Sequence, residues 1–230
     1  MIERLRDSLA TVIFTVAVVV LTITFSIGLP IYARNVYYAH LPSIQQDVYE
    51  WTDVWVEEDV IVEAYDEILD FLTLPGREFG SGRLPYSEEG KGHFEDCKIL
   101  FDLNRNAFLI SLGVVIFLLI WDRCDIIHLV KFRGLSPTYW AGVGTLATFA
   151  TLAVVVAPNF EKAFEIFHKM FFPGKDNWMF NPYNDPIILF MPMNFFMNCA
   201  VLICLSILTI SLVHILVGYA KRDKFYWLDK

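Results

Sequence analysis

Two histidines of this largely apolar chain occupy places where they can exchange protons. His93 follows a glycine-rich stretch, and we expect a helix to begin near it and to bring Asp96 onto the same face. At a helix start the backbone dipole favours the neutral imidazole, which accepts a proton. His168 lies near the end of a helix predicted from Asn159 to the stop at Pro173, where the dipole favours the charged ring. The pair therefore predicts general base and acid chemistry.

Other kinds of site receive less support from the sequence. No phosphate-binding glycine loop, dinucleotide fingerprint or nucleophile elbow is present. His93, Asp96 and His168 could together form a facial metal site, so a metal-dependent membrane hydrolase remains an alternative, although no two histidines have metal-binding spacing. A non-enzymatic four-span scaffold or lipid-binding protein is the other alternative, and it would not require paired histidines.

The elements that position these residues are expected to be membrane helices. Hydrophobic residues make up 56% of the chain, and the apolar runs at 9–32, 107–121, 139–157 and 198–219 are near the length that crosses a bilayer. The second run is short and is expected to extend the apolar face of a helix at 93–106. The first run is too long for a cleaved signal and lacks a cleavage site, so we interpret it as a retained anchor.

The placement of lysine and arginine predicts that both termini are cytoplasmic. With that orientation the inner segments (1–8, 122–138 and 220–230) hold nine Lys or Arg in 36 residues, and the outer segments (33–106 and 159–197) hold nine in 113. The outer segments are strongly acidic, which argues against nucleic acid as a partner.

The outer segments are expected to form a small, mainly helical extracellular cap. One amphipathic helix is predicted near 57–73, and the other is the helix at 93–106. The apolar segment 187–197 is broken by Pro192, and it is expected either to meet acyl chains at the outer interface or to pack under the cap. The cysteines are interpreted as packing residues, although a Cys97–Cys199 bridge is conceivable. The fold class is an all-α integral membrane protein with four transmembrane helices.

The two outer segments resemble the lipoprotein intramolecular transacylase (Lit) family of bacterial membrane enzymes. The resemblance rests on motifs in a fixed order: His93-Phe94-Glu95-Asp96, Phe167-His168 followed by aromatics and Pro173, Asn177-Trp178, Asn181-Pro182, Asp185, Met191-Pro192 and Phe195-Phe196. The chain departs from the family pattern at Asn181, where an aspartate is expected, and at Met193, where an acidic residue often follows the proline.

The resemblance implies an acyl transfer within one substrate molecule. The sn-2 acyl group of a diacylglyceryl-modified N-terminal cysteine of an apolipoprotein would move to the free α-amine, through an eight-membered cyclic intermediate, to give a lyso-form lipoprotein. Because the nucleophile is tethered to the ester, its proximity lowers part of the reaction barrier. The change from ester to amide is downhill, so no cofactor, ATP or external acyl donor is expected. The expected partners are this substrate and membrane lipids, at the outer face of a bacterial cell membrane.

We expect His93 to act as the base toward the amine and His168 as the acid toward the leaving alkoxide or as the stabiliser of the oxyanion, with the two roles exchangeable. Asp96 and Asp185 are candidates for orienting a histidine. Asn177, Trp178 and Asn181 are expected to supply hydrogen-bond donors or shape.

Overall fold

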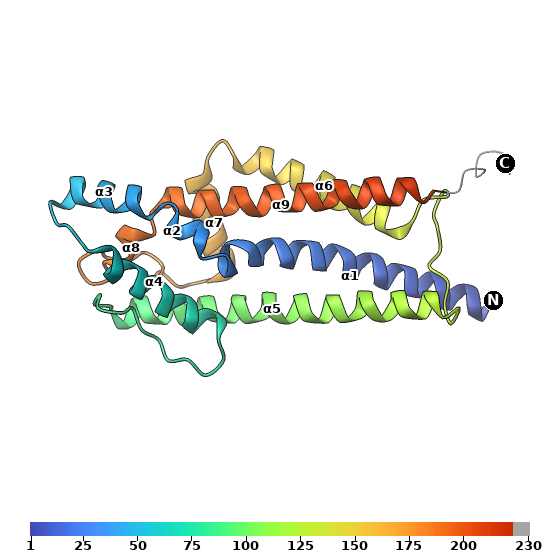
Figure 1. Ribbon diagram of the computed structural model, residues 1–230, viewed down its shortest axis with the longest axis horizontal. Coiled ribbons are helices and arrows are strands. Elements are labelled where there is room, and N and C mark those ends of the chain that lie inside the picture. The colour runs from blue at the N-terminus through green and yellow to red at the C-terminus, as the bar shows by residue number, and fades with distance from the viewer. Residues whose placement is uncertain (223–230) are drawn as a thin grey trace. The chain divides into compact units, whose positions relative to one another are not determined.

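The computed structural model describes residues 1–222, and all regular structure within them is helical (Figure 1). The helices are α1 Ile2–Tyr32, α2 Asn35–Tyr38, α3 Leu41–Thr52, α4 Glu58–Thr73, α5 Glu88–Arg123, α6 Pro137–Val156, α7 Phe160–Phe171, α8 Ile187–Phe190 and α9 Met193–Ala220. The tail expected at 220–230 lies outside the described residues from 223 onward.

The chain divides into two compact units. We call Met1–Gly28, Arg105–Ala157 and the chain from Leu202 onward the bundle unit, and Leu29–Asn104 with Pro158–Val201 the histidine unit. Helices α1, α5 and α9 each contribute residues to both units.

Four helical stretches are long and apolar enough to cross a membrane: Ile2–Tyr32, Glu88–Arg123, Pro137–Phe171 and Met193–Ala220. In α5 no charged residue lies between Arg105 and Asp122, so the crossing part is this C-terminal apolar run of the helix. In Pro137–Phe171 the apolar part is α6, whereas α7 carries several charges. The chain is therefore a multi-pass, all-α integral membrane protein, as the sequence predicted.

Buried apolar side chains and small serine side chains make the contacts between the helices of the bundle unit. Phe14 of α1 and Leu118 of α5 share a buried cluster with Ala141 of α6. The Ser26 and Ser206 hydroxyls of α1 and α9 lie 3.0 Å apart. Figure 1 shows these four helices running side by side. Such close approaches are the usual basis of helix association in lipid, where the hydrophobic effect is absent.

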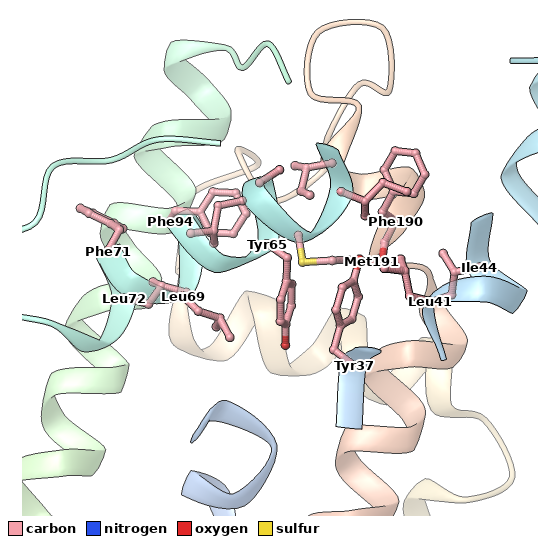
Figure 2. Close-up of a cluster of buried hydrophobic side chains, with 14 of the residues drawn as sticks. Tyr37, Leu41, Ile44, Tyr65, Leu69, Phe71, Leu72, Phe94, Phe190 and Met191 are labelled. Carbon is pink, nitrogen blue, oxygen red and sulfur yellow. Dashed lines mark hydrogen bonds between the residues drawn. The ribbon is translucent and has the colours of Figure 1, made fainter. Parts of the chain in front are cut away.

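The histidine unit has a conventional apolar core, shown in Figure 2. The Tyr37 ring stacks on Tyr65 of α4 with centroids 3.7 Å apart, and the Tyr37 hydroxyl donates to the Phe190 carbonyl at 3.0 Å. The remaining members are mainly aliphatic side chains of α3 and α4, with Phe94 of α5. This core joins α2, α3, α4 and Phe94 of α5 to α8, which lies more than ninety residues later in the chain.

Several helix boundaries differ from the expected ones, among them the starts of α1 at Ile2 and of α6 at Pro137 instead of 9 and 139. Helix α5 begins at Glu88 rather than near His93, because the Ser87 hydroxyl accepts from the Gly90 amide and caps the helix. Helix α3, which was not predicted, buries Leu41 and other apolar residues of the 33–56 stretch. Helix α9 begins at Met193, five residues before the expected start.

The apolar segment 187–197 packs into the core of the histidine unit. Ile187, Phe190 and Met191 are buried, and Phe195 contacts both Tyr37 and Tyr65. Of the two interpretations left open by the sequence, the structure supports packing under the cap for these residues.

Candidate active site

Two helices of the histidine unit carry the histidines. Helix α5 places His93, Asp96 and Cys97 at spacings of three and four, so they share a side of the helix. Helix α7 carries His168 in its last turn, and its start is capped by Asn159, whose side chain accepts from the Lys162 amide at 2.9 Å. The cap at Asn159 is the one that the sequence predicted.

The two imidazole rings meet in the folded protein. Their centroids lie 5.7 Å apart with an interplanar angle of 32°. His93 is 6% exposed and His168 is 7% exposed, so both rings are enclosed by protein. Residues 75 positions apart are thereby brought together, and paired acid–base chemistry requires such proximity.

His93 makes one polar contact and leaves one nitrogen without a partner. Its Nε2 lies 3.4 Å from the Cys97 Sγ, whereas Nδ1 is buried and has no hydrogen-bond partner. Phe172 and Phe180 enclose the ring at centroid distances of 5.1 and 5.5 Å. Burial, followed by the nearby His168, lowers the pKa of His93 to about 4. The ring is therefore neutral at pH 7.

The cause of this neutrality differs from the expected one. Because α5 begins at Glu88, His93 lies in the second turn, where the helix dipole has little effect. Burial of the ring, rather than the dipole, disfavours the charge.

His168 has a fixed tautomer when it is neutral. Its Nδ1 lies 2.8 Å from the Phe164 carbonyl oxygen, which can only accept, so Nδ1 carries the hydrogen and Nε2 keeps a lone pair. Burial lowers the pKa of His168, although the bond to Phe164 opposes it. The expected bias of His168 toward its charged form was wrong, because burial of the ring disfavours the charge.

The Asp96 carboxylate binds the loop after α7 rather than a histidine. It forms an ion pair with Lys175 and accepts from the Asn177 side-chain amide at 3.3 Å. Burial opposes ionisation, yet these two hydrogen bonds keep the pKa of Asp96 below its usual value. Asp96 affects His93 through its charge and makes no hydrogen bond to the ring.

Asp185 is also engaged away from the histidines. It is buried, and its two oxygens accept from the Ser87 amide and the Ser87 hydroxyl, each at 2.8 Å. The carboxylate thus holds the N-terminus of α5, a favourable place for a negative charge. The hypothesis that it orients a histidine directly does not agree with these contacts.

The remaining predicted residues lie in the loop after α7. The Trp178 ring stacks on His168 with centroids 4.6 Å apart, and its Nε1 donates to the Lys175 carbonyl at 3.2 Å. The Asn181 side chain accepts from the Tyr183 amide at 3.0 Å within the loop. Trp178 therefore supplies shape at the site, whereas Asn181 stabilises a turn.

The metal site considered from the sequence does not form as a cluster. Within residues 1–222, no group of three or more His, Cys, Asp or Glu side chains is arranged to hold a metal ion. The Asp96 carboxylate is directed to Lys175 and Asn177 instead. All four cysteines are free thiols, so the conceivable Cys97–Cys199 bridge is not formed.

Sequence reasoning gave no site role to several residues that contact the histidines, including Phe164, whose carbonyl accepts from His168. Cys97 was interpreted as packing, and Phe172 and Phe180 were given no role at the site. The spacing of Cys97 from His93 was an available signal, since residues four apart on a helix are neighbours. Nothing in the sequence indicated that the loop folds Phe180 onto α5.

Comparisons with known proteins agree with this fold. The sequence profile described as "Lipoprotein intramolecular transacylase Lit" matches residues 12–196. A Bacillus cereus structure titled as the membrane integral lipoprotein intramolecular transacylase Lit has a TM-score of 0.80, with 24% identity over 94% of this chain and 95% of that chain. A variant of that protein, in which one histidine is replaced by arginine, has a TM-score of 0.76, with 22% identity over 96% of this chain and 93% of that chain. At these identities the structural likeness concerns the fold.

A curated relative matches part of the chain. An uncharacterized protein of Aquifex aeolicus (strain VF5) is 29% identical over 120 residues, which are 51% of this chain and 51% of that protein. The match therefore spans about half the length of the curated relative.

Proposed function

The chain belongs to the lipoprotein intramolecular transacylase Lit family, and from this premise we propose that it moves an acyl chain within a lipoprotein. The substrate is an apolipoprotein whose N-terminal cysteine carries a diacylglyceryl group. The sn-2 acyl group passes from the glyceryl oxygen to the α-amino nitrogen, and the product is a lyso-form lipoprotein. The observation that carries the proposal is the meeting of two buried, neutral imidazoles at 5.7 Å.

The reaction needs a base at the attacking nitrogen. An α-amine has a pKa of about 8, so much of it is charged at neutral pH and cannot attack. We assign the base to His168, because its Nδ1–H bond to Phe164 leaves the Nε2 lone pair free. This exchanges the roles first expected for the two histidines.

Bond making and bond breaking balance within the substrate. The α-nitrogen forms a bond to the acyl carbon while His168 takes a proton from it, and the resulting tetrahedral centre carries an oxyanion. The bond from the acyl carbon to the glyceryl oxygen then breaks, and that oxygen takes the proton back from the His168 imidazolium. His93 serves this centre as a hydrogen-bond donor to the oxyanion.

Burial of the rings supports transfer rather than hydrolysis. Phe180 and Phe172 enclose His93, whereas Trp178 stacks on His168 and the tilted Phe164 ring contacts it. A reacting ester held among these side chains is protected from water, while its own amine is already tethered nearby. An environment of this kind favours the internal nucleophile.

The test is mass spectrometry of a lipoprotein's N-terminal peptide after co-expression. Intramolecular transfer leaves the peptide mass unchanged and places one acyl chain on nitrogen in the fragment spectrum. We expect His93→Ala and His168→Ala each to lower the yield of this product by at least about 10²-fold, because each removes a positioned proton-handling group. His40→Ala, which alters an exposed histidine of the same unit, is the matched control and should retain activity.

Two outcomes would contradict the proposal, and a third would show that the control is unsuitable. An unchanged yield of the product in both site variants would mean that the two histidines do not carry the reaction. A peptide that has lost the mass of one acyl chain would indicate a hydrolase. Loss of activity in the His40→Ala control would indicate a general effect on folding.

A further inference from the structure

Cys97 lies one helical turn after His93 and contacts its ring. The Cys97 Sγ is 3.4 Å from the His93 Nε2, and the thiol is free. The other ring nitrogen of His93, Nδ1, is buried without a partner on a side chain that is only 6% exposed. One nitrogen of His93 thus contacts the Cys97 thiol, and the other is buried without a hydrogen-bond partner in the protein.

Both members of this contact are neutral at physiological pH. Burial, with a smaller contribution from Asp96, raises the pKa of the Cys97 thiol to about 12. The charged or titratable groups that face His93 are His168, Asp96 and Lys175, and none of them hydrogen-bonds to the ring. The S–H hydrogen is therefore present, and the neutral imidazole carries one hydrogen that can reside on either nitrogen.

The hydrogen-bonding abilities of the two groups decide between the tautomers. A thiol sulfur is a weak acceptor, whereas the bare nitrogen of an imidazole is a good one. The arrangement S–H to Nε2 is therefore favoured over N–H to sulfur. With Nε2 accepting from sulfur, the ring hydrogen must be on Nδ1.

We propose that Cys97 is a positioning residue that holds His93 in the Nδ1–H tautomer, with this N–H directed to the reacting group. The inference deepens the proposed function, because the oxyanion donor assigned to His93 is this N–H. It also gives the two histidines different tasks. His168 carries its hydrogen on the nitrogen facing the Phe164 carbonyl and offers a lone pair, whereas His93 offers a hydrogen.

The tautomer is observable by nitrogen NMR of the full chain, labelled with ¹⁵N-histidine and purified in detergent. Protonated and bare imidazole nitrogens resonate in separate regions, and the His93 signals are assigned from their loss in His93→Gln. We expect a protonated Nδ1 and a bare Nε2 in the natural protein and in Cys97→Ser, since a hydroxyl also donates. In Cys97→Ala we expect the Nε2–H form to become populated.

The acyl-transfer rate supplies the second measurement. Cys97→Ala should slow the transfer about tenfold, the value of one hydrogen bond of ordinary strength, and Cys97→Ser should restore most of the rate. Cys199→Ala is the matched control, because Cys199 is a half-buried thiol of the same unit that contacts neither histidine. Its spectrum and rate should match those of the natural protein.

The inference is overturned if His93 of the natural protein carries its hydrogen on Nε2, or if Cys97→Ala changes neither the tautomer nor the rate. A changed tautomer with an unchanged rate also overturns the positioning role. These results are separable from failure of the proposed function, which is decided by activity in His93→Ala. Because the spectrum of the natural protein is decisive by itself, the test stands even if Cys97→Ala fails to fold.

Discussion

At the scale of single residues, the protein places two titratable rings where charge is costly. Burial lowers the pKa of both His93 and His168, and it does so for His93 to about 4. Proton transfer at neutral pH therefore begins from two neutral imidazoles, and their different hydrogen-bond partners distinguish them. Phe164 offers His168 a carbonyl oxygen, whereas Cys97 offers His93 a thiol.

Stability should fall in acid because His93 is kept neutral in the folded state. Above a pH of about 6.5, the His93 ring is neutral in both the folded and unfolded states, so its titration does not change the free energy of unfolding. As the pH falls from 6.5 toward 4, only the unfolded chain binds the proton, which costs the folded state on the order of 3 kcal/mol. Thermal unfolding in detergent across this range measures the effect.

The matched variant for this measurement is His93→Gln, which cannot titrate. Its loss of unfolding free energy between pH 6.5 and 4 should be smaller than that of the natural protein, with the remaining part due to His168 and other groups. Equal losses in the two proteins would mean that His93 is accessible to protons in the folded state.

At the scale of elements, the site depends on how the start of α5 is fixed. Ser87 caps the helix, and the buried Asp185 carboxylate binds both the amide and the hydroxyl of Ser87. Gly90 allows this approach, because a Cβ at that position would clash with the Asp185 carboxylate. A residue of the second outer segment thereby sets the position of the helix that carries His93.

Asp185→Ala should lower the free energy of unfolding by about 1–3 kcal/mol, because it leaves two donors at the start of α5 unpaired. Acyl transfer should decrease with it, since the helix start is no longer held. Asp176→Ala is the control, because it removes an exposed carboxylate from the same loop. Thermal unfolding and product yield are measured together.

Unchanged stability in Asp185→Ala combined with complete loss of activity would contradict this structural role. That result would return Asp185 to the task first expected from the sequence, the orientation of a histidine.

At the scale of the whole molecule, the chain forms two compact units that differ in composition. The bundle unit contains the apolar parts of the four candidate spans, and the histidine unit contains both histidines, the apolar core of Figure 2 and the acidic segments. The density of Lys and Arg then predicts which segments face the cytoplasm.

We expect the loop after α7 to be outside the cell and the loop after α5 to be inside. Tyr183, which is 93% exposed, is suited for replacement by cysteine in a chain that also carries Cys124→Ser. A membrane-impermeant maleimide should label Tyr183→Cys in intact cells. In the natural protein the exposed Cys124 should be labelled only after lysis. The opposite pattern would reverse the predicted orientation.

The sequence by itself determined the fold class and the four candidate membrane spans, and it predicted a role for the two histidines. Spans can be recognised because a bilayer crossing needs about 20 consecutive apolar residues, and the helix end that carries His168 is indicated by Asn159 and Pro173. The amphipathic stripe of α4 was legible for the same reason, because helical periodicity is a local property.

Only the tertiary structure decided what each site residue touches. The carboxylates of Asp96 and Asp185 were expected at histidines, but they hold a loop and a helix start instead. The charge state of His168 was also misjudged, since burial is a property of the assembled unit and the dipole is a property of one helix. The contacts of His93 with Phe180 and His168 join segments 75 or more residues apart, and no local pattern encodes such distances.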